Sequence, residues 1–372
     1  MEATNEHDAL LGAADIRRIA ASVGVKPTKK LGQNFVIDPG TVRRIVREAG
    51  VQAGSQVLEV GPGLGSLTLA LLETGARVTC VEIDPVLAGR LPQTVAERMP
   101  DAVASAGDGA AADVTAAAAA TPRFAVVNRD ALAFEASDLD GVAGAIDVTK
   151  PFTLVANLPY NVATPIVLTL LERFPSMDGF LVMVQDEVAD RLAAGPGSKT
   201  YGAPSVKLAW YGTAQKAGKV GRNVFWPAPN VDSALVRFTR DGRRDESLRE
   251  RTFALVEAAF AQRRKTLRAA LKGIADAESI EAAGIDPTVR GERLLIDDFV
   301  ALASRMEAHM GEGGQSAVSS SAGDPASAGD PASAGDPASA GGSVPADAPA
   351  FAAGSTSAPA AGSMSADAEA TV

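Results

Sequence analysis

The stretch Val57-Leu-Glu-Val-Gly-Pro-Gly-Leu-Gly-Ser66 decides the fold class. Residues 57–60 form a short, largely apolar run typical of a buried strand, and Gly61 ends it. A helical pattern follows over residues 66–74. Glycines in the intervening turn let the backbone pass close to a ligand, because no Cβ stands in the way. The stretch therefore predicts a strand–turn–helix unit of an α/β domain with a ligand at its turn.

Further short apolar runs, separated by helical patterns, follow this unit along the chain. They cover residues 78–83, 124–128, 152–156 and 180–185. Buried strands that alternate with helices indicate parallel βαβ units. Residues 213–220 and 231–239 predict an antiparallel pair that closes the sheet, and from 249 to about 308 the periodicity is helical. The predicted fold class is α/β with a small C-terminal all-α domain.

Composition divides the chain into four predicted parts. They are an N-terminal extension (1–24), the α/β domain (25–240), the helical domain (241–310) and an acidic tail (311–372). The tail repeats Ser-Ala-Gly-Asp-Pro-Ala, a composition that buries too little apolar surface to offset ordering entropy, so we expect disorder there. We expect the same of the Ala-rich insertion 101–122, whose run of alanines is also compatible with a marginal helix.

The charge distribution leaves room for a nucleic-acid partner despite a net charge of −10. Residues 311–372 contain seven acidic residues and no Lys or Arg, so residues 1–310 carry only −3. Binding to nucleic acid requires a basic face and not a basic total. The overall acidity therefore does not exclude RNA.

Cysteine and histidine usage argues against several classes of site. The single Cys80 excludes an internal disulfide and a multi-cysteine metal site. The two histidines, His7 and His309, lie in no motif, so we expect neither histidine catalysis nor a metal. We find no signal-peptide pattern and no apolar run of about eighteen residues. The sequence therefore predicts a cytoplasmic protein without a membrane span.

Acidic residues follow the second and third predicted strands. Glu82 ends the second strand and Asp130 follows the third, which in a doubly wound sheet places both beside the glycine turn. Glu82 is suited to accept from two ribose hydroxyls, and Asp130 from an adenine amine. The glycine spacing is G-x-G-x-G and not the G-x-G-x-x-G of dinucleotide binders. This combination fits S-adenosylmethionine, although a tight turn and solvated strand-end acids are the plainer interpretations of each part.

The tetrapeptide Asn157-Leu-Pro-Tyr160 comes at the end of the fourth predicted strand. By itself Asn-x-Pro is a turn former. At this edge of the sheet, however, the Asn157 side-chain carbonyl and a backbone carbonyl near Pro159 are suited to accept the two hydrogens of an adenine amine. That would direct the nitrogen lone pair toward a methyl donor. Tyr160 offers a flat face on which an extruded base can stack.

Together these motifs resemble the family of small-subunit ribosomal RNA adenine dimethyltransferases, the kasugamycin-sensitivity enzymes. The resemblance covers roughly residues 25–305 and rests on the order of several motifs. They are Lys29-Lys-Leu-Gly-Gln-Asn-Phe35, Glu59-Val-Gly-Pro-Gly-Leu-Gly65, Val81-Glu-Ile-Asp84, Asn157-Leu-Pro-Tyr160, Gly195-Pro-Gly-Ser-Lys-Thr-Tyr-Gly202, Pro227-Ala-Pro-Asn-Val-Asp-Ser233 and Phe260-Ala-Gln-Arg-Arg-Lys-Thr-Leu267.

The resemblance implies a fold, a reaction and a set of contacts. It implies a Rossmann-like methyltransferase domain with a helical RNA-binding domain, and transfer of four methyl groups to two adjacent adenosines. These adenosines lie in a hairpin loop near the 3′ end of 16S rRNA in the assembling small ribosomal subunit, and we expect a monomer. The cofactor contacts implied by matching motif are Asn34, Val36, Gly61, Glu82, Asp130 and Asn157. The family usually has Leu where Val36 stands, which is harmless if the contact is made by backbone.

Basic residues flank the predicted pocket and are candidate RNA contacts. They are Lys29 and Lys30 before the Gln-Asn-Phe segment, Lys199 and Tyr201 in a loop read as an RNA-facing flap, and Arg263, Arg264 and Lys265 in the helical domain. Phosphate contacts of this kind position a substrate without selecting its base. For any single cluster, a solvated helix face is the plainer interpretation.

Three alternative functions share part of this pattern. Large-subunit rRNA dimethyltransferases that confer macrolide resistance have the same cofactor loop and an Asn-x-Pro-aromatic motif. A ribosome-assembly factor would bind the small subunit without catalysis, and a DNA adenine methyltransferase uses a similar tetrapeptide. The 195–202 loop and the Arg-Arg-Lys-Thr-Leu run favour the small-subunit enzyme.

Overall fold

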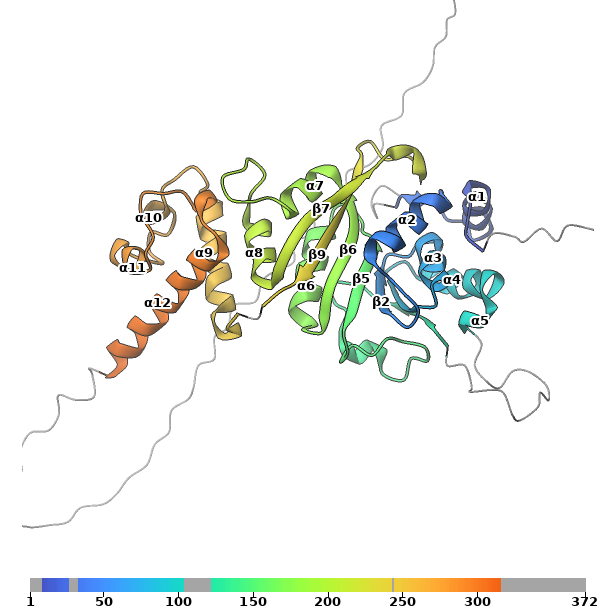
Figure 1. The fold of residues 1–372 in the computed structure, drawn as a ribbon, viewed down its shortest axis with the longest axis horizontal. Helices are drawn as coiled ribbons and strands as arrows, with labels where there is room; N and C mark the ends of the chain where they lie inside the picture. Colours follow the sequence, from blue (N-terminus) through green and yellow to red (C-terminus); the bar gives the residue numbers. More distant parts are fainter. Residues whose placement is uncertain (1–8, 27–32, 104–121, 243, 316–372) are drawn as a thin grey trace, which may run out of the picture. The chain divides into compact units, whose positions relative to one another are not determined.

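A seven-stranded sheet forms the centre of the protein, seen here in a computed structural model that describes residues 9–26, 33–103, 122–242 and 244–315 (Figure 1). Its strand order is β4-β3-β2-β5-β6-β9-β7. The strands are β2 (Gln56–Val60), β3 (Arg77–Glu82), β4 (Phe124–Asn128), β5 (Phe152–Asn157), β6 (Met177–Gln185), β7 (Gly212–Val220) and β9 (Ser233–Arg240). The first five pair in parallel, and β9 pairs antiparallel with both β6 and β7. The predicted α/β class is confirmed.

The strand order reverses beside β2, and this reversal places the site. The chain runs outward from β2 to β3 and β4 on one side, then returns to β5 on the other. In the register of the sheet, Val60 lies opposite Val81, Glu82 opposite Asn128, and Leu58 opposite Leu154. The carboxyl ends of these strands therefore meet at one edge, where an open α/β sheet has its binding crevice.

Alternate residues of the strands face two different cores. Val155 of β5 belongs to a core built with α1 (Ala13–Ser22), α2 (Pro39–Ala49), α3 (Ser66–Glu73) and α4 (Pro85–Arg98). Its neighbour Leu154 belongs to the core on the other face, with α6 (Ala163–Arg173) and α8 (Ala203–Tyr211). This alternation follows from the two-residue period of a strand. Figure 1 shows α1 to α4 gathered on one side of the sheet.

The helical region is α9 (Arg249–Ala261), α10 (Leu267–Ala270), α11 (Ala277–Ala282) and α12 (Ile296–Gln315). It shares a continuous buried core with the second face of the sheet, to which Leu255, Phe299 and Phe180 all belong. The Phe253 ring of α9 packs edge-on against Trp210 of α8, with centroids 5.8 Å apart. All the described residues belong to one compact unit. No helix within them is both long enough and apolar enough to cross a membrane.

Two predicted boundaries differ from the structure. Residues 13–22, assigned to an N-terminal extension, form α1, which buries Ile16 and Ile19 and is tied to α4 by an Asp15–Arg98 ion pair of 2.7 Å. The predicted insertion began at residue 101, but Pro100–Val103 form the short helix α5 with Ala102 buried. The buried Ile16 and Ile19 of α1 have the i, i+3 spacing of a helical face, whereas α5 is too short to show any helical pattern. Residues 104–121, Lys29, Lys30 and residues 316–372 lie outside the described residues.

The shared core makes a prediction for Phe299→Ala. Phe299 is fully buried in α12, so its truncation should lower the free energy of unfolding by about 3–5 kcal/mol. Denaturant unfolding followed by far-UV circular dichroism should remain a single transition with a lower midpoint. Arg305→Ala, on the exposed side of the same helix, is the matched control and should change stability by less than about 0.5 kcal/mol. Separate melting of the helical region would contradict a shared core.

Candidate active site

The glycine turn between β2 and α3 has backbone conformations and neighbours that require glycine at position 63. Gly63 has φ of +59°, and a Cβ placed there would lie 2.8 Å from Cε1 of Phe35. Phe35 belongs to the short strand β1 (Phe35–Val36), which pairs antiparallel with β8 (Phe225–Trp226). The ring of Phe35 therefore covers the turn that the first motif predicts, and any larger residue at position 63 would displace it.

Glu82 lies at the end of β3 with its carboxylate against this turn. Its Oε2 accepts from the backbone N–H of Gly63 at 3.1 Å, and its Oε1 accepts from the N–H of Asp84 at 3.0 Å. The side chain is buried, and burial raises the pKa of this carboxyl above its usual value. The two backbone donors orient the carboxylate, and each oxygen keeps a second lone pair for a ligand.

Asp130 follows β4 on the same edge. Its Oδ1 accepts from the N–H of Leu132 at 2.9 Å, which fixes the carboxylate in a tight turn. The neighbouring strand is held by Asn128, whose Nδ2 donates to the carbonyl of Glu82 at 2.8 Å. The structure thus brings Asp130 and Glu82 together on one wall, as the strand pattern predicts.

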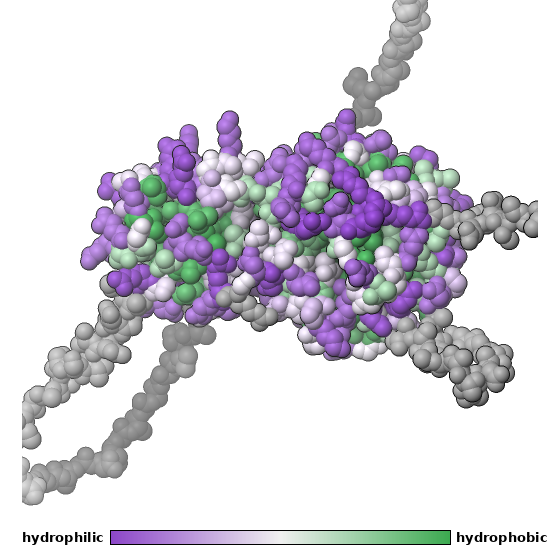
Figure 2. Space-filling model, viewed as in Figure 1, coloured by the Kyte–Doolittle hydropathy of each residue, from purple (hydrophilic) through white to green (hydrophobic). Residues whose placement is uncertain are grey.

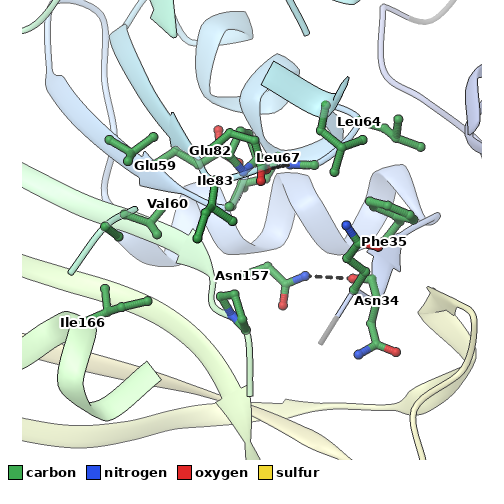
Figure 3. Close-up of a pocket in the computed structure, with 18 of the residues that line it drawn as sticks. Asn34, Phe35, Glu59, Val60, Leu64, Leu67, Glu82, Ile83, Asn157 and Ile166 are labelled. Atoms are coloured by element: carbon green, nitrogen blue, oxygen red, sulfur yellow. Dashed lines mark hydrogen bonds between the residues drawn. The ribbon is translucent and has the colours of Figure 1, made fainter. Parts of the chain in front are cut away.

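Asn157, at the end of β5, is held in one orientation by the N-terminal segment. Its Nδ2 donates to the backbone carbonyl of Asn34 at 3.0 Å (Figure 3). The next residue, Leu158, donates its N–H to the carbonyl of Met183 in β6 at 3.1 Å. With its amide nitrogen occupied in this way, the Asn157 side chain presents its Oδ1 as an acceptor. Sequence reasoning missed the bond to Asn34, because 123 residues separate the two partners.

These residues line a single cleft that is open to solvent. All six predicted cofactor contacts line it, together with Pro159: Asn34, Val36, Gly61, Glu82, Asp130 and Asn157. Leu67, Leu87, Ile83 and Ile166 supply apolar walls. Figure 3 shows Glu82 on one side of the cleft and Asn157 with Asn34 on the other. The described part of the chain contains no group of three or more His, Cys, Asp or Glu placed to hold a metal.

Tyr160 is anchored by a residue that the sequence reasoning did not single out. Its Oη lies 2.9 Å from Oγ of Ser233, the fully buried first residue of β9. Burial raises the pKa of the Tyr160 phenol, so the hydroxyl stays neutral near pH 7. Ser233 occurs in the Pro227–Ser233 motif, but nothing in that motif indicates a contact with Tyr160.

Glu59 is a second buried carboxyl on the cleft, also missed from sequence because it stands within an apolar strand. Its Oε2 accepts from Oγ1 of Thr68 at 2.7 Å and from the thiol of Cys80 at 3.5 Å. Complete burial raises its pKa from the usual 4.5 to about 8. Because no cation among the described residues offsets this burial, the group stays protonated at neutral pH.

This chain is similar to proteins that are named ribosomal RNA methyltransferases. A family model described as ribosomal RNA adenine dimethylase matches residues 24–307. The chain belongs to the ribosomal RNA adenine dimethylase family. A protein of Bifidobacterium longum (strain DJO10A), named ribosomal RNA small subunit methyltransferase A, is 62% identical over 311 residues, or 80% of this chain and 94% of that protein. A protein of the same name from Streptomyces griseus is 55% identical, over 81% of this chain and 96% of that protein.

Two solved structures share the fold. The 23S rRNA methyltransferase ErmE has a TM-score of 0.52 and 26% identity, over 74% of this chain and 100% of that one. A dimethyladenosine transferase from Plasmodium falciparum has a TM-score of 0.57 and 20% identity, over 74% of this chain and 98% of that one. The Plasmodium likeness establishes a common architecture and nothing more. This adenine dimethylase therefore combines the family's fold with the cleft described above.

The predicted RNA contacts fall into three groups in this dimethylase. The side chains of Lys199, Arg264 and Lys265 are exposed and form no ion pair with any described residue. Arg263 is engaged internally, in an ion pair of 2.8 Å with Glu292. Tyr201, predicted to face RNA, is buried instead: its hydroxyl donates to the carbonyl of Leu294 at 2.8 Å. Its assignment as an RNA contact is corrected, because no part of the ring is free to reach a substrate.

The buried Glu59 predicts a pH-dependent stability. Its pKa is about 8 in the folded state, against the usual 4.5. Between these two values the unfolded chain loses the proton and the folded protein keeps it. The free energy of unfolding of the wild type should therefore fall as the pH rises from 4.5 to about 8. The decrease in the free energy of unfolding should amount to a few kcal/mol, because each unit of pKa shift corresponds to about 1.4 kcal/mol. Glu59→Gln cannot ionise and should not show this decrease. Thermal unfolding between pH 5 and about 9 measures it. The exposed substitution Glu281→Gln is the control, and equal slopes for wild type and Glu59→Gln would contradict the prediction.

Proposed function

We propose that this protein transfers methyl groups from S-adenosylmethionine to the exocyclic amines of two adjacent adenosines near the 3′ end of 16S rRNA, giving dimethyladenosines. The observation that carries the proposal is the fixed amide of Asn157, whose Nδ2 donates to Asn34 so that its Oδ1 faces the cleft edge as an acceptor. We further propose that the protein acts as a monomer on the small ribosomal subunit, in the cytoplasm, during subunit biogenesis.

The cleft fits S-adenosylmethionine through its donor and acceptor set. Glu82 offers lone pairs suited to two ribose hydroxyls, and Asp130 an acceptor suited to an adenine amine. Ile83 and Leu87 provide apolar surface for the adenine ring. Gly61 and Gly63 line the cleft with positive φ values that favour glycine, and at Gly63 the Phe35 ring leaves no room for a Cβ. Asn34 and Val36 complete the wall. The bound molecule would supply an electrophilic methyl on a sulfonium that leaves as a neutral thioether.

The chain's own contribution to the chemistry is to orient a weakly nucleophilic amine. The lone pair of an adenine amine is delocalised into the ring, and two acceptors for its hydrogens would turn that lone pair toward the methyl donor. Asn157 Oδ1 is one acceptor. The carbonyl of Pro159 is directed toward the N–H of Val162, 3.3 Å away, so we assign the second role to the carbonyl of Leu158. The amine proton passes to solvent after transfer, and no histidine base is required.

Tyr160 would stack on the extruded adenine while Pro159 shapes the turn beneath it. The hydrogen bond to Ser233 holds the phenol ring to the end of β9, which limits its rotation. A ring that is already ordered loses less entropy when a base stacks on it. Stacking of a base on an aromatic side chain contributes about 1–3 kcal/mol.

We favour the small subunit as the substrate because the chain is more similar to small-subunit methyltransferases than to a 23S rRNA methyltransferase. Proteins named small subunit methyltransferase A are 62% and 55% identical to this chain, against 26% for the 23S enzyme ErmE. Lys199, Arg264 and Lys265 would contact RNA phosphates. Figure 2 shows hydrophilic side chains projecting from the edge that carries the loop between α7 (Asp186–Leu192) and α8. We keep Lys29 and Lys30 as further proposed contacts, although they lie outside the described residues.

The test is methyl transfer from labelled S-adenosylmethionine to small subunits that lack this modification, with large subunits as the parallel substrate. Label confined to small subunits, mapping to paired dimethyladenosines near the 3′ end, is the expected outcome. Label in large-subunit RNA would assign the protein to the macrolide-resistance class. Tight binding to small subunits without any label would indicate an assembly factor and overturn the enzymatic proposal.

Replacement of Asn157 tests the amine-orienting role. Asn157→Ala should lower kcat by about 100-fold or more, the cost of removing one preorganised polar group from an active site. Asn157→Asp should be at least as damaging, because a carboxylate oxygen would face the Asn34 carbonyl. Single-turnover methyl transfer measures both. Asn161→Ala, next to the motif, is the matched surface control. Near-normal turnover by Asn157→Ala would rule out the proposed role.

The Tyr160–Ser233 pair gives a separate prediction. Tyr160→Phe and Ser233→Ala each remove the same hydrogen bond and keep the ring, so each should reduce kcat only a few-fold. The double variant should be no worse than either single one, because both changes break one interaction. Tyr160→Ala removes the stacking face and should cost about 10- to 100-fold. Additive losses in the double variant would show that the two hydroxyls act independently.

A further inference from the structure

We infer that Arg263 and Glu292 are positioning residues for RNA binding: their ion pair clamps the 195–202 loop so that Lys199 is held beside Arg264 and Lys265. The inference rests on the proposed function, since it concerns how the RNA-contacting surface is ordered. The sequence pattern gives no reason to distinguish the adjacent Arg263 and Arg264. The inference assigns a phosphate contact to Arg264 and not to Arg263.

The clamp consists of direct contacts between the loop and the helical region. Nε of Arg263 donates to Oε2 of Glu292 at 2.8 Å, and its Nη2 donates to the carbonyls of Lys199 at 3.0 Å and Ser198 at 3.3 Å. The backbone carbonyl of Glu292 in turn accepts from the N–H of Gly197 at 2.8 Å. The planar guanidinium thus spans a carboxylate and two carbonyls at once, a geometry that lysine cannot reproduce.

A buried tyrosine fastens the end of the same loop. The Tyr201 hydroxyl donates to the carbonyl of Leu294, and the ring packs edge-on against Phe260 of α9 with centroids 5.9 Å apart. Burial raises the pKa of Tyr201 to about 12, so the phenol remains a donor at every physiological pH. The loop between α7 (Asp186–Leu192) and α8 is therefore attached within its exposed section, at residues 197–199, and at Tyr201 where that section ends.

Three cations surround this clamp with no internal partner. Lys199 contributes one of the carbonyls that Arg263 binds, and Arg264 and Lys265 follow Arg263 directly, yet all three side chains are exposed and unpaired among the described residues. An unclamped loop would have to be ordered by the RNA itself, which costs backbone conformational entropy at each residue that becomes fixed. Preorganisation of the three cations therefore raises affinity without adding a phosphate contact.

The direction in which Glu292→Gln changes the RNA affinity distinguishes a clamp from a direct phosphate contact. If Arg263 contacted phosphate directly, Glu292 would compete for it, and Glu292→Gln would strengthen RNA binding. If the pair is a clamp, Glu292→Gln loosens the loop and weakens binding. Arg263→Lys keeps the charge and should also weaken binding, because it loses the bridging geometry.

The experiment measures affinity for unmodified small subunits as a function of salt, with the full-length protein. Arg263→Lys and Glu292→Gln should each weaken binding about 5- to 20-fold with an unchanged slope of log K against log salt, and raise KM while leaving kcat unchanged. Tyr201→Phe, which changes no charge, should act in the same direction. For Arg263→Lys and Glu292→Gln, the melting temperature and the S-adenosylmethionine affinity should stay near wild-type values, which a general folding defect would lower. Tyr201→Phe loses a buried hydrogen bond and should melt slightly lower, but should keep its S-adenosylmethionine affinity.

Matched substitutions of Arg264 are the control for direct contact. Arg264→Gln should reduce the salt slope by about one, and Arg264→Lys should bind nearly as wild type. Stronger binding by Glu292→Gln, or a reduced slope for an uncharged Arg263→Gln variant, would overturn the clamp. So would wild-type affinity in both Arg263→Lys and Glu292→Gln. If neutral substitutions of Arg264 and Lys265 also left the affinity and the salt slope unchanged, the proposed RNA surface itself would be wrong.

Discussion

The parallel register of β3, β2 and β5 is the constraint on which the site depends. Because the three strands run in the same direction, the turn after β2, the carboxylate of Glu82 and the amide of Asn157 all emerge at one edge. The N–H of Gly63 then donates to Glu82, so the acid that faces a ligand also holds the glycine turn in place. A slip of one residue in any of these strands would turn its side chains to the opposite face and dismantle the site.

The segment from Asn34 to Val36 connects the glycine turn after β2 with Asn157 at the end of β5. The segment from Asn34 to Val36 covers Gly63 with the Phe35 ring, pairs with Phe225 and Trp226, and offers the Asn34 carbonyl to Asn157. One short strand therefore contacts both the place proposed for the methyl donor and the group proposed to orient the acceptor. The site also holds two buried carboxyls, Glu59 and Glu82, and burial raises the pKa of each because it disfavours the charged form.

The helical region is part of the same folded body, since its core is continuous with the sheet's. Its contacts with the 195–202 loop show how a basic sequence run divides into different roles. Arg263 is directed inward to a carboxylate and two carbonyls, whereas Arg264 and Lys265 are exposed. Only the cationic side chains that have no partner within the protein remain available to contact a substrate.

The sequence by itself determined the α/β class, the strands of the seven-stranded sheet and the six predicted cofactor contacts that line the cleft, because each depends on local periodicity or on a motif within a few residues. It also indicated the helical C-terminal region. Only the tertiary structure decided that Asn34 orients Asn157, that Ser233 holds Tyr160, that Tyr201 is buried and that Arg263 faces Glu292. These pairs are 29 to 123 residues apart, and polar side chains such as Arg and Tyr read the same in sequence whether they meet solvent or a buried carbonyl. Their partners are chosen by the packing of distant elements, which no local pattern encodes.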